Sequence, residues 1–127
     1  MQVIDLDHLV LTVASIERAV AFYERVLGMR GKLFGDDKRT ALRFGSHKIN
    51  LHERGKEFEP KAAAPMPGSA DLCFLVDDFS ANQAHLAAAV VPILEGPVRR
   101  AGARGPIMAY YVRDPDPNLI ELSRYVT

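Results

Sequence analysis

The sequence predicts an α+β fold built from two successive modules, each with the element order strand, helix, strand, strand, strand. Short runs of alternating apolar residues are typical of strands, and each half contains one longer segment with helical spacing or composition. The second half also repeats the element order of the first, after a connector with three prolines and clustered charge. We expect module one at about residues 1–55, the connector at about 56–69 and module two at about 70–127, all within a single domain.

Module one opens with residues 4–13, which alternate like a half-buried strand. Ser15 then caps a helix whose apolar positions recur at helical spacing, and Gly28 ends it. Three short strands follow, separated by the turns "GDDK" and "GSH". We expect them at residues 32–34, 40–44 and 48–53.

Module two repeats this plan. A strand is expected at residues 71–76 and a helix at 79–90, followed by strands at residues 92–95, 107–112 and 119–125. When "DHLVLTV" is aligned with "ADLCFLV", His8 falls on Asp71. When "KINLHE" is aligned with "LIELSR", Asn50 falls on Glu121. The shared order of elements indicates an internal duplication.

Side chains alternate between the two faces of a strand, so position parity separates them. In four strands one face is uniformly apolar, and we expect the two helices to cover it. An ionised side chain in a sheet is costly unless water or a partner compensates its charge. The polar residues on the opposite face must therefore contact either solvent or a partner. That face carries His8, Asn50, His52, Asp71, Glu121 and Ser123.

Composition excludes several classes of function. Lys+Arg and Asp+Glu both number 16, so no overall charge attracts nucleic acid or a membrane surface. The apolar runs are far shorter than the roughly 18 residues that a membrane span needs, and the N-terminus lacks the layout of a secretion signal. The single cysteine, Cys73, cannot form an internal disulfide, which favours a reducing compartment. We therefore expect a cytoplasmic protein that binds neither nucleic acid nor a membrane.

Three segments, "DHLVLTVASIERAVAFYERVLGM", "ALRFGSHKINLH" and "DPDPNLIEL", resemble the vicinal oxygen chelate superfamily. This superfamily includes glyoxalase I, fosfomycin-resistance enzymes, bleomycin-resistance proteins and extradiol dioxygenases. More narrowly, "INLHERGKEFEPKA" and "EGPVRRAGARGPI" resemble the group of glyoxalase domain-containing protein 5. The resemblance implies paired βαβββ modules that form a cupped, barrel-like mixed sheet with the helices outside. It also implies one divalent metal ion in the cup, a small-molecule substrate and a homodimer.

The resemblance also implies roles for individual residues. His8 matches the first-strand metal ligand and Glu121 the last-strand carboxylate, while Asn50 and Asp71 fall where glyoxalase I has a carboxylate and a histidine. His52 lies on the same face as Asn50 and is the alternative ligand; His8, His52 and Glu121 would suit zinc, nickel, manganese or iron. Asn50 then binds substrate, and Asp71 ligates the metal or exchanges a proton. Each also has a structural alternative, such as a hydrogen-bonded strand histidine for His8 or a strand cap for Asp71.

The segment "VRRAGARGPI" predicts a flexible cationic loop in front of a strand. Arg100 and Arg104 in this loop are candidates to bind a carboxylate or phosphonate group of a substrate, because guanidinium groups match such oxygens. The alternative is a loop whose arginines face only solvent. Cys73 lies on the polar face by parity, and we expect it to fill space rather than act as a nucleophile.

The function that the resemblance implies is a metal-dependent lyase or isomerase of the glyoxalase type, related to lactoylglutathione lyase. Its substrate is a small oxygenated molecule, with a thiol adduct as one candidate. Glu121 and Asp71 are the carboxylates available to move a proton. Two alternatives stay open: an Fe(II) extradiol-type dioxygenase that uses His8, His52 and Glu121, and a non-enzymatic resistance protein that binds a drug or metabolite.

Overall fold

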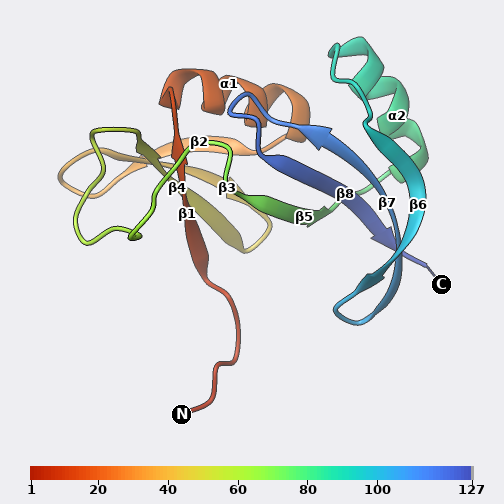
Figure 1. Ribbon diagram of the computed structural model, residues 1–127, viewed down its shortest axis with the longest axis horizontal. Helices are drawn as coiled ribbons and strands as arrows, with labels where there is room; N and C mark the ends of the chain where they lie inside the picture. Colours follow the sequence, from red (N-terminus) through yellow and green to blue (C-terminus); the bar gives the residue numbers. More distant parts are fainter. Residues whose placement is uncertain (127) are drawn as a thin grey trace. The chain divides into compact units, whose positions relative to one another are not determined.

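The structure is a computed structural model that describes residues 1–126. The chain divides into two compact units, unit 1 (Met1–Ser69) and unit 2 from Ala70 onward. Each unit has the predicted order of one strand, one helix and three strands, which confirms the α+β class and the two βαβββ modules. Unit 1 contains β1 (His8–Val13), α1 (Ile16–Leu27), β2 (Arg30–Phe34), β3 (Arg39–Phe44) and β4 (His47–Glu53); unit 2 contains β5 (Asp71–Leu75), α2 (Phe79–Ala88), β6 (Glu95–Gly102), β7 (Gly105–Arg113) and β8 (Leu119–Tyr125) (Figure 1).

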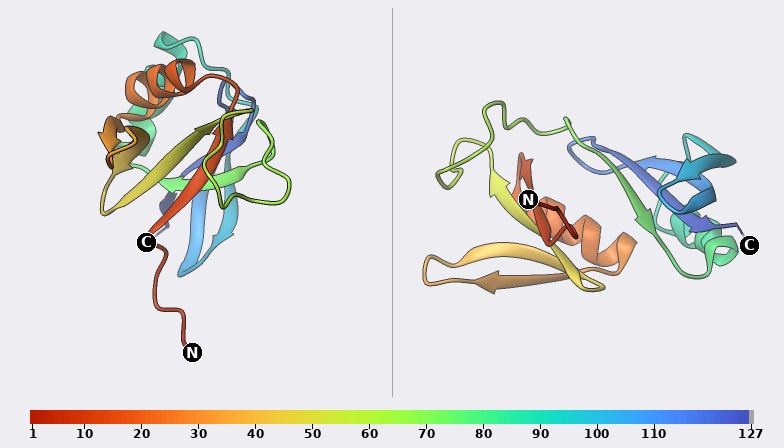
Figure 2. Two further views of the ribbon diagram at one scale, coloured as in Figure 1. Left: turned by 90° about the vertical axis from the view of Figure 1, so that its left-hand side faces the viewer. Right: turned by 90° about the horizontal axis from the view of Figure 1, so that it is seen from below.

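The unit 1 sheet has the strand order β1-β4-β3-β2. β1 runs parallel to β4, and the other two pairs are antiparallel. α1 packs on one face of this sheet (Figure 2), where it contacts β2, β3 and β4. The face predicted to be covered is indeed buried, and it includes Leu11, Val13, Ile49 and Leu51.

Both ends of α1 follow the sequence prediction. The Ser15 side chain accepts a hydrogen bond from the Arg18 backbone N–H, with a distance of 3.2 Å between Oγ and N. Gly28 has φ +67° and donates its backbone N–H to the Glu24 carbonyl. This left-handed conformation is available to glycine at little cost, so the helix ends there.

The unit 2 sheet has the order β5-β8-β7-β6, the same topology as unit 1. Asp71 lies opposite Leu119 and Cys73 opposite Glu121 in the parallel β5–β8 ladder. In the parallel β1–β4 ladder, the corresponding pairs are His8 with Lys48 and Val10 with Asn50. The register therefore places His8 and Asp71, and likewise Asn50 and Glu121, at equivalent positions of the two units.

Several predicted boundaries are wrong, and β2 and β7 each begin two residues earlier than predicted. Larger or more consequential differences occur in β1, α2 and β6. β1 begins at His8 rather than residue 4, because its ladder with β4 starts at the His8–Lys48 pair. α2 ends at Ala88 rather than at Val90, whose φ is +58°. The strand expected at residues 92–95 instead spans Glu95–Gly102. The supposed flexible loop is thus the β6–β7 hairpin, whose pairing extends to Gly102 and Gly105.

The "DPDPN" turn before β8 is held by a buried network of hydrogen bonds. Oδ1 of Asp114 accepts the backbone N–H groups of Asp116 and Asn118 at 2.9 and 2.7 Å, while Oδ2 accepts the Asn118 side-chain amide at 2.8 Å. The Asn118 Oδ1 atom in turn accepts the backbone N–H of Ala70 at 2.9 Å. The turn therefore joins the start of β5 to the start of β8 and fixes the strand that carries Glu121.

Among residues 1–126, no helix has the length and apolar character required to cross a membrane.

Candidate functional site

The first candidate ligand, His8, lies at the start of β1 with 42% of its side chain exposed. Its ring nitrogen Nδ1 is 2.7 Å from Oδ1 of Asp7, so the N–H donates to the carboxylate. This hydrogen bond is the main reason that the pKa of Asp7 is lowered. A carboxylate at Nδ1 fixes the tautomer and leaves Nε2 as the lone-pair donor, the arrangement common among metal-binding histidines.

Asn50 lies on the same face, two register positions along the ladder from His8. Its side-chain oxygen Oδ1 is buried and has no hydrogen-bond partner among the described residues. A buried carbonyl oxygen without a donor costs about 1–3 kcal/mol. Amide oxygens bind cations, particularly hard ones, so this atom fits a metal ion or a ligand donor.

His52 is placed differently from the prediction. It lies opposite Thr12, four register positions from the pair that contains His8. Four steps correspond to about 13 Å along the strands. Its ring is also buried, with 7% exposed, and packs against Phe58 of the connector with 5.7 Å between centroids. Within unit 1 the register thus brings Asn50, rather than His52, next to His8.

Unit 2 carries the two predicted carboxylates on one face of its sheet. Glu121 is half-buried, with Cys73 on β5 and Tyr111 on β7 as its register partners. Asp71 is exposed and lies two positions away on β5. The unit 2 ladder therefore brings Glu121 and Asp71 close together on the side away from α2.

Cys73 is the cross-strand neighbour of Glu121. Its sulfur Sγ lies 3.0 Å from Oγ of Ser123, whose hydroxyl donates to the Phe74 carbonyl at 3.1 Å. Cys73 is exposed, so the expectation that it fills space in the core is wrong. The pKa of its thiol is nevertheless raised, mainly by partial desolvation and further by the charge of Glu121. Because the thiolate is the reactive form, this environment argues against a nucleophilic role.

The sequence analysis did not single out Tyr111. Its hydroxyl accepts a hydrogen bond from Nε of Arg100 at 3.1 Å, and its side chain shares a face with Glu121. The alternation of residues 107–112 could have predicted on which face Tyr111 lies. Only the register shows that Tyr111 lies directly opposite Glu121.

The two predicted substrate-binding arginines have partners within unit 2. Arg100 is in β6, and its Nη2 donates to Oε1 of Glu95 at 3.1 Å in addition to the bond to Tyr111. Arg104 lies in the hairpin turn, with its guanidinium 4.4 Å from the Tyr125 ring centroid. Its backbone N–H donates to the Tyr125 hydroxyl at 3.1 Å. The structure thus orders both side chains instead of leaving them on a loose loop.

The predicted metal ligands are divided between the units. Unit 1 holds His8, Asn50 and His52, and unit 2 holds Asp71 and Glu121. Among residues 1–126 no three His, Cys, Asp or Glu side chains form a group that could hold a metal ion. Whether a cation fits must therefore be judged from the individual donor atoms. Asn50 Oδ1 is buried and has no hydrogen-bond partner among the described residues, and the His8 ring is oriented by Asp7.

A family model for the Glyoxalase/Bleomycin resistance protein/Dioxygenase superfamily matches residues 5–122. The chain belongs to this superfamily. The resemblance found in the sequence is thereby confirmed.

Similar members of the superfamily cover nearly the whole chain. Glyoxalase domain-containing protein RDO1 of Mycosarcoma maydis is 56% identical over 126 residues, which are 98% of this chain and 70% of that protein. Virulence protein STM3117 of Salmonella typhimurium is 52% identical over 122 residues, which are 95% of this chain and 84% of that protein. The crystal structure of STM3117 matches with a TM-score of 0.96 at 51% identity, covering 99% of this chain and 100% of that one.

More distant structures share the fold alone. A lactoylglutathione lyase from Agrobacterium tumefaciens has a TM-score of 0.69 at 21% identity, covering 94% of this chain and 92% of that one. The antibiotic-binding protein TnmS3 from Streptomyces has a TM-score of 0.76 at 20% identity, covering 99% of each chain. The same architecture thus occurs in a protein named as an enzyme and in one named as a binder, so the function must be argued from the site.

Proposed function

We propose that this protein is a divalent-metal-dependent lyase or isomerase of the glyoxalase type that acts on a small oxygenated substrate. The main support is the buried, unpartnered Oδ1 atom of Asn50, two register positions from His8. An oxygen acceptor without a donor next to an oriented imidazole is the environment that a cation satisfies. The proposal includes a homodimer in the cytoplasm.

In this proposal Nε2 of His8 and the carboxylate of Glu121 would each ligate a divalent ion, because they are the two family ligand positions that are unchanged in kind. Asn50 and His52 are the candidates to complete the set. The register favours Asn50, since His52 lies four positions from the His8 pair beneath Phe58. An amide oxygen suits harder ions such as Mn²⁺ better than it suits softer ones. When bound, such an ion polarises a substrate oxygen and stabilises the negative charge that develops on it.

The other groups on the unit 2 face divide the remaining tasks. Asp71 is exposed and lies two positions from Glu121, so it is available to accept a proton from the substrate when Glu121 ligates. Tyr111 accepts its hydrogen bond from Arg100, which leaves its own hydroxyl proton free to donate to a substrate oxygen. Arg100 therefore contributes to substrate binding by orienting Tyr111, and Arg104 remains the candidate to bind an anionic group at the hairpin turn.

The dioxygenase alternative has less support. It requires His8 and His52 on one iron, yet the two residues lie about 13 Å apart along the ladder by register. The binding-protein alternative requires no metal. Metal content thus separates it from the enzyme.

The test uses protein purified without a histidine tag. Samples are incubated separately with Mn²⁺, Zn²⁺, Ni²⁺ and Fe²⁺, desalted and analysed for bound metal. We expect stoichiometric binding of at least one ion that is lost in His8→Ala and in Glu121→Gln, while His85→Ala, on the exposed side of α2, retains it. The holoprotein is then assayed with methylglyoxal in the presence of a panel of thiols, with and without chelator. Wild-type protein that binds none of the four ions would favour a metal-free binding protein instead. Normal metal binding by both site variants would show that His8 and Glu121 do not hold the ion.

A further inference from the structure

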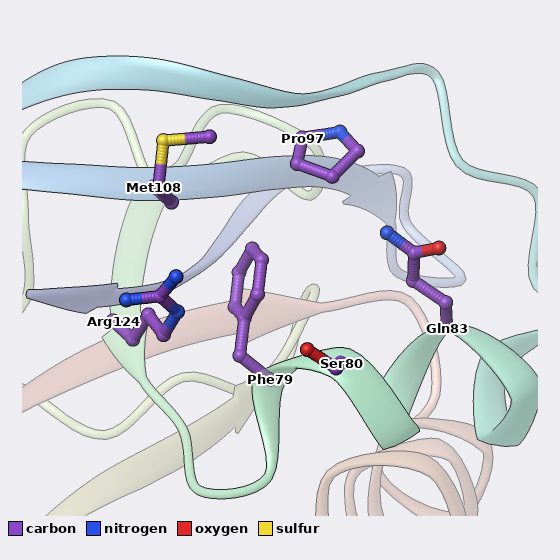
Figure 3. Close-up of a pocket in the computed structure, with 6 residues that line it drawn as sticks. All are labelled: Phe79, Ser80, Gln83, Pro97, Met108 and Arg124. Atoms are coloured by element: carbon purple, nitrogen blue, oxygen red, sulfur yellow. The ribbon is translucent and has the colours of Figure 1, made fainter. Parts of the chain in front are cut away.

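A hollow of about 300 Å³ lies in unit 2 beside the start of α2 (Figure 3). It lies on the opposite side of the sheet from Glu121. The parity of β8 separates the two places, because Arg124 lies on the face of Leu122, which is buried on the side of α2. The hollow is therefore distinct from the candidate metal site. It is lined by Phe79, Ser80, Gln83, Pro97, Met108 and Arg124.

Three elements, α2, β7 and β8, form the floor of the hollow. Phe79 begins α2, and its carbonyl accepts the buried hydroxyl of Tyr110 at 2.9 Å, while the two rings lie 4.5 Å apart. Met108 on β7 and Arg124 on β8 are register partners, so their side chains project side by side. Both flank the Phe79 ring in Figure 3.

A wall of the hollow is formed by β6, which approaches β7 closely. A Cβ atom on Gly96 would lie 2.5 Å from the Ala109 carbonyl oxygen and 2.8 Å from the Tyr110 Cα, and the residue has φ +111°. Only glycine tolerates this conformation and spacing. The next residue, Pro97, is thereby held over the hollow, opposite the first turn of α2 (Figure 3).

The polar groups around the hollow are largely unused. Arg124 makes one long hydrogen bond, 3.3 Å from Nη1 to the Tyr125 carbonyl, and its guanidinium lies 5.5 Å from the Phe79 ring centroid. Among residues 1–126 no carboxylate pairs with Arg124, and the side chains of Ser80 and Gln83 have no hydrogen-bond partner. The N-cap residue Asp78 makes no side-chain capping bond, so its side chain satisfies none of the first backbone N–H groups of α2.

We propose that this hollow binds a small aromatic carboxylate. The carboxylate pairs with the guanidinium of Arg124, and the ring packs against Phe79, Pro97 and Met108. Ser80 and Gln83 lie on the other side of Phe79 in Figure 3, where they offer hydrogen bonds to a polar substituent on the ring. The volume is at the lower end of the range for small-molecule pockets, which sets the limit on ligand size. This site requires neither the metal nor the residues of the proposed active site.

The probe is benzoate, and benzamide is its uncharged control of the same shape. Both are titrated into isotope-labelled full-length protein and followed through the Met108 methyl signal and the Ser80 and Gln83 amide signals. We expect benzoate to saturate these shifts with a Kd at least about tenfold lower than that of benzamide, the usual gain from a hydrogen bond to a charged group. In Arg124→Gln the two probes should bind equally weakly, while Arg113→Gln, exposed at the end of β7, should leave the preference unchanged.

A spectrum of Arg124→Gln with wild-type dispersion confirms that the variant is folded. Arg124→Lys provides a second variant, which keeps the positive charge and should therefore retain part of the preference for benzoate over benzamide. Equal binding of the two probes to the wild type, or shifts located away from these residues, would overturn the proposal. Benzoate binding that survives in Glu121→Gln and under chelation distinguishes this site from the metal site, so either proposal can fail without the other.

Discussion

His8 donates a hydrogen bond from Nδ1 to Oδ1 of Asp7 over a distance of 2.7 Å. The pair lies at the start of the β1–β4 ladder. Because Nδ1 is used in this hydrogen bond, Nε2 is the ring nitrogen of His8 that is left to bind a metal ion. A neutral imidazole oriented in this way is a stronger ligand than a freely rotating one. The effect of an Asp7 substitution on metal affinity therefore tests whether His8 binds metal.

Asp7→Asn should weaken Mn²⁺ or Zn²⁺ binding about tenfold, because it removes the carboxylate that orients His8. Since the pKa of Asp7 is lowered, the carboxylate stays ionised at a more acidic pH than an ordinary aspartate. Asp7 is therefore ionised throughout the pH range in which a neutral imidazole is available to bind metal, so the difference between wild type and variant should persist wherever binding is measurable. Calorimetric titration from neutral to acidic pH measures this. Asp5→Asn is the control, because the Asp5 carboxylate bonds to the Leu6 backbone instead of to a histidine.

Cys73 should react slowly with iodoacetamide. Its pKa is raised, so at mildly alkaline pH it holds a smaller thiolate fraction than a free thiol, and its rate should continue to rise beyond the pH at which N-acetylcysteine levels off. Glu121→Gln removes a neighbouring negative charge and should accelerate the reaction several-fold at fixed pH. Rates are measured on chelated protein by mass spectrometry. An unchanged rate in Glu121→Gln would contradict the contact between the two side chains.

Gly96→Ala should destabilise the protein by about 3 kcal/mol, because strain from the positive φ adds to overpacking against β7. Gly45→Ala is the matched control, with φ +52° but nothing within 4 Å of the added Cβ atom, and it should cost about 1 kcal/mol. Urea unfolding compares the two. Similar losses would show that the close approach of β6 to β7 is not rigid.

Asp114→Ala should destabilise the protein by about 3 kcal/mol, because it leaves two buried donor groups and one partly buried donor group without their acceptor. Asp36→Ala, in the exposed turn between β2 and β3, should change stability by less than about 0.5 kcal/mol. Urea unfolding measures both. A small effect of Asp114→Ala would mean that the turn relaxes and lets water reach these groups.

Local sequence signals predicted the element order because each element in unit 1 carries its own pattern. Ser15 and Gly28 mark the ends of α1, and alternation identified Leu11 and Ile49 as residues on the buried face. The position of β6 was predicted wrongly, at residues 92–95. This strand is the edge strand of the unit 2 sheet and pairs with β7 alone. An edge strand can be polar and contain glycine and proline, so its sequence looks like a loop.

The faces of the candidate site could be predicted, but not its register. Parity placed His8, Asn50 and His52 on one face, and the structure agrees. Which of them are neighbours depends on how β1 aligns with β4, and these strands are separated by α1, β2 and β3. No local pattern encodes that alignment. The pairing of Tyr111 with Glu121 was not foreseen for the same reason.

The position of β6 has a consequence for how copies of the protein behave at high concentration. Within the described part of unit 2, one side of this strand offers backbone groups to no neighbouring strand, and such a row readily recruits another extended chain. Arg99 and Arg100 are adjacent on it, so two copies that meet there bring like charges together. We expect this repulsion, reduced by the pairing of Arg100 with Glu95, to hinder fibrous assembly at this edge and to weaken when concentrated salt screens it.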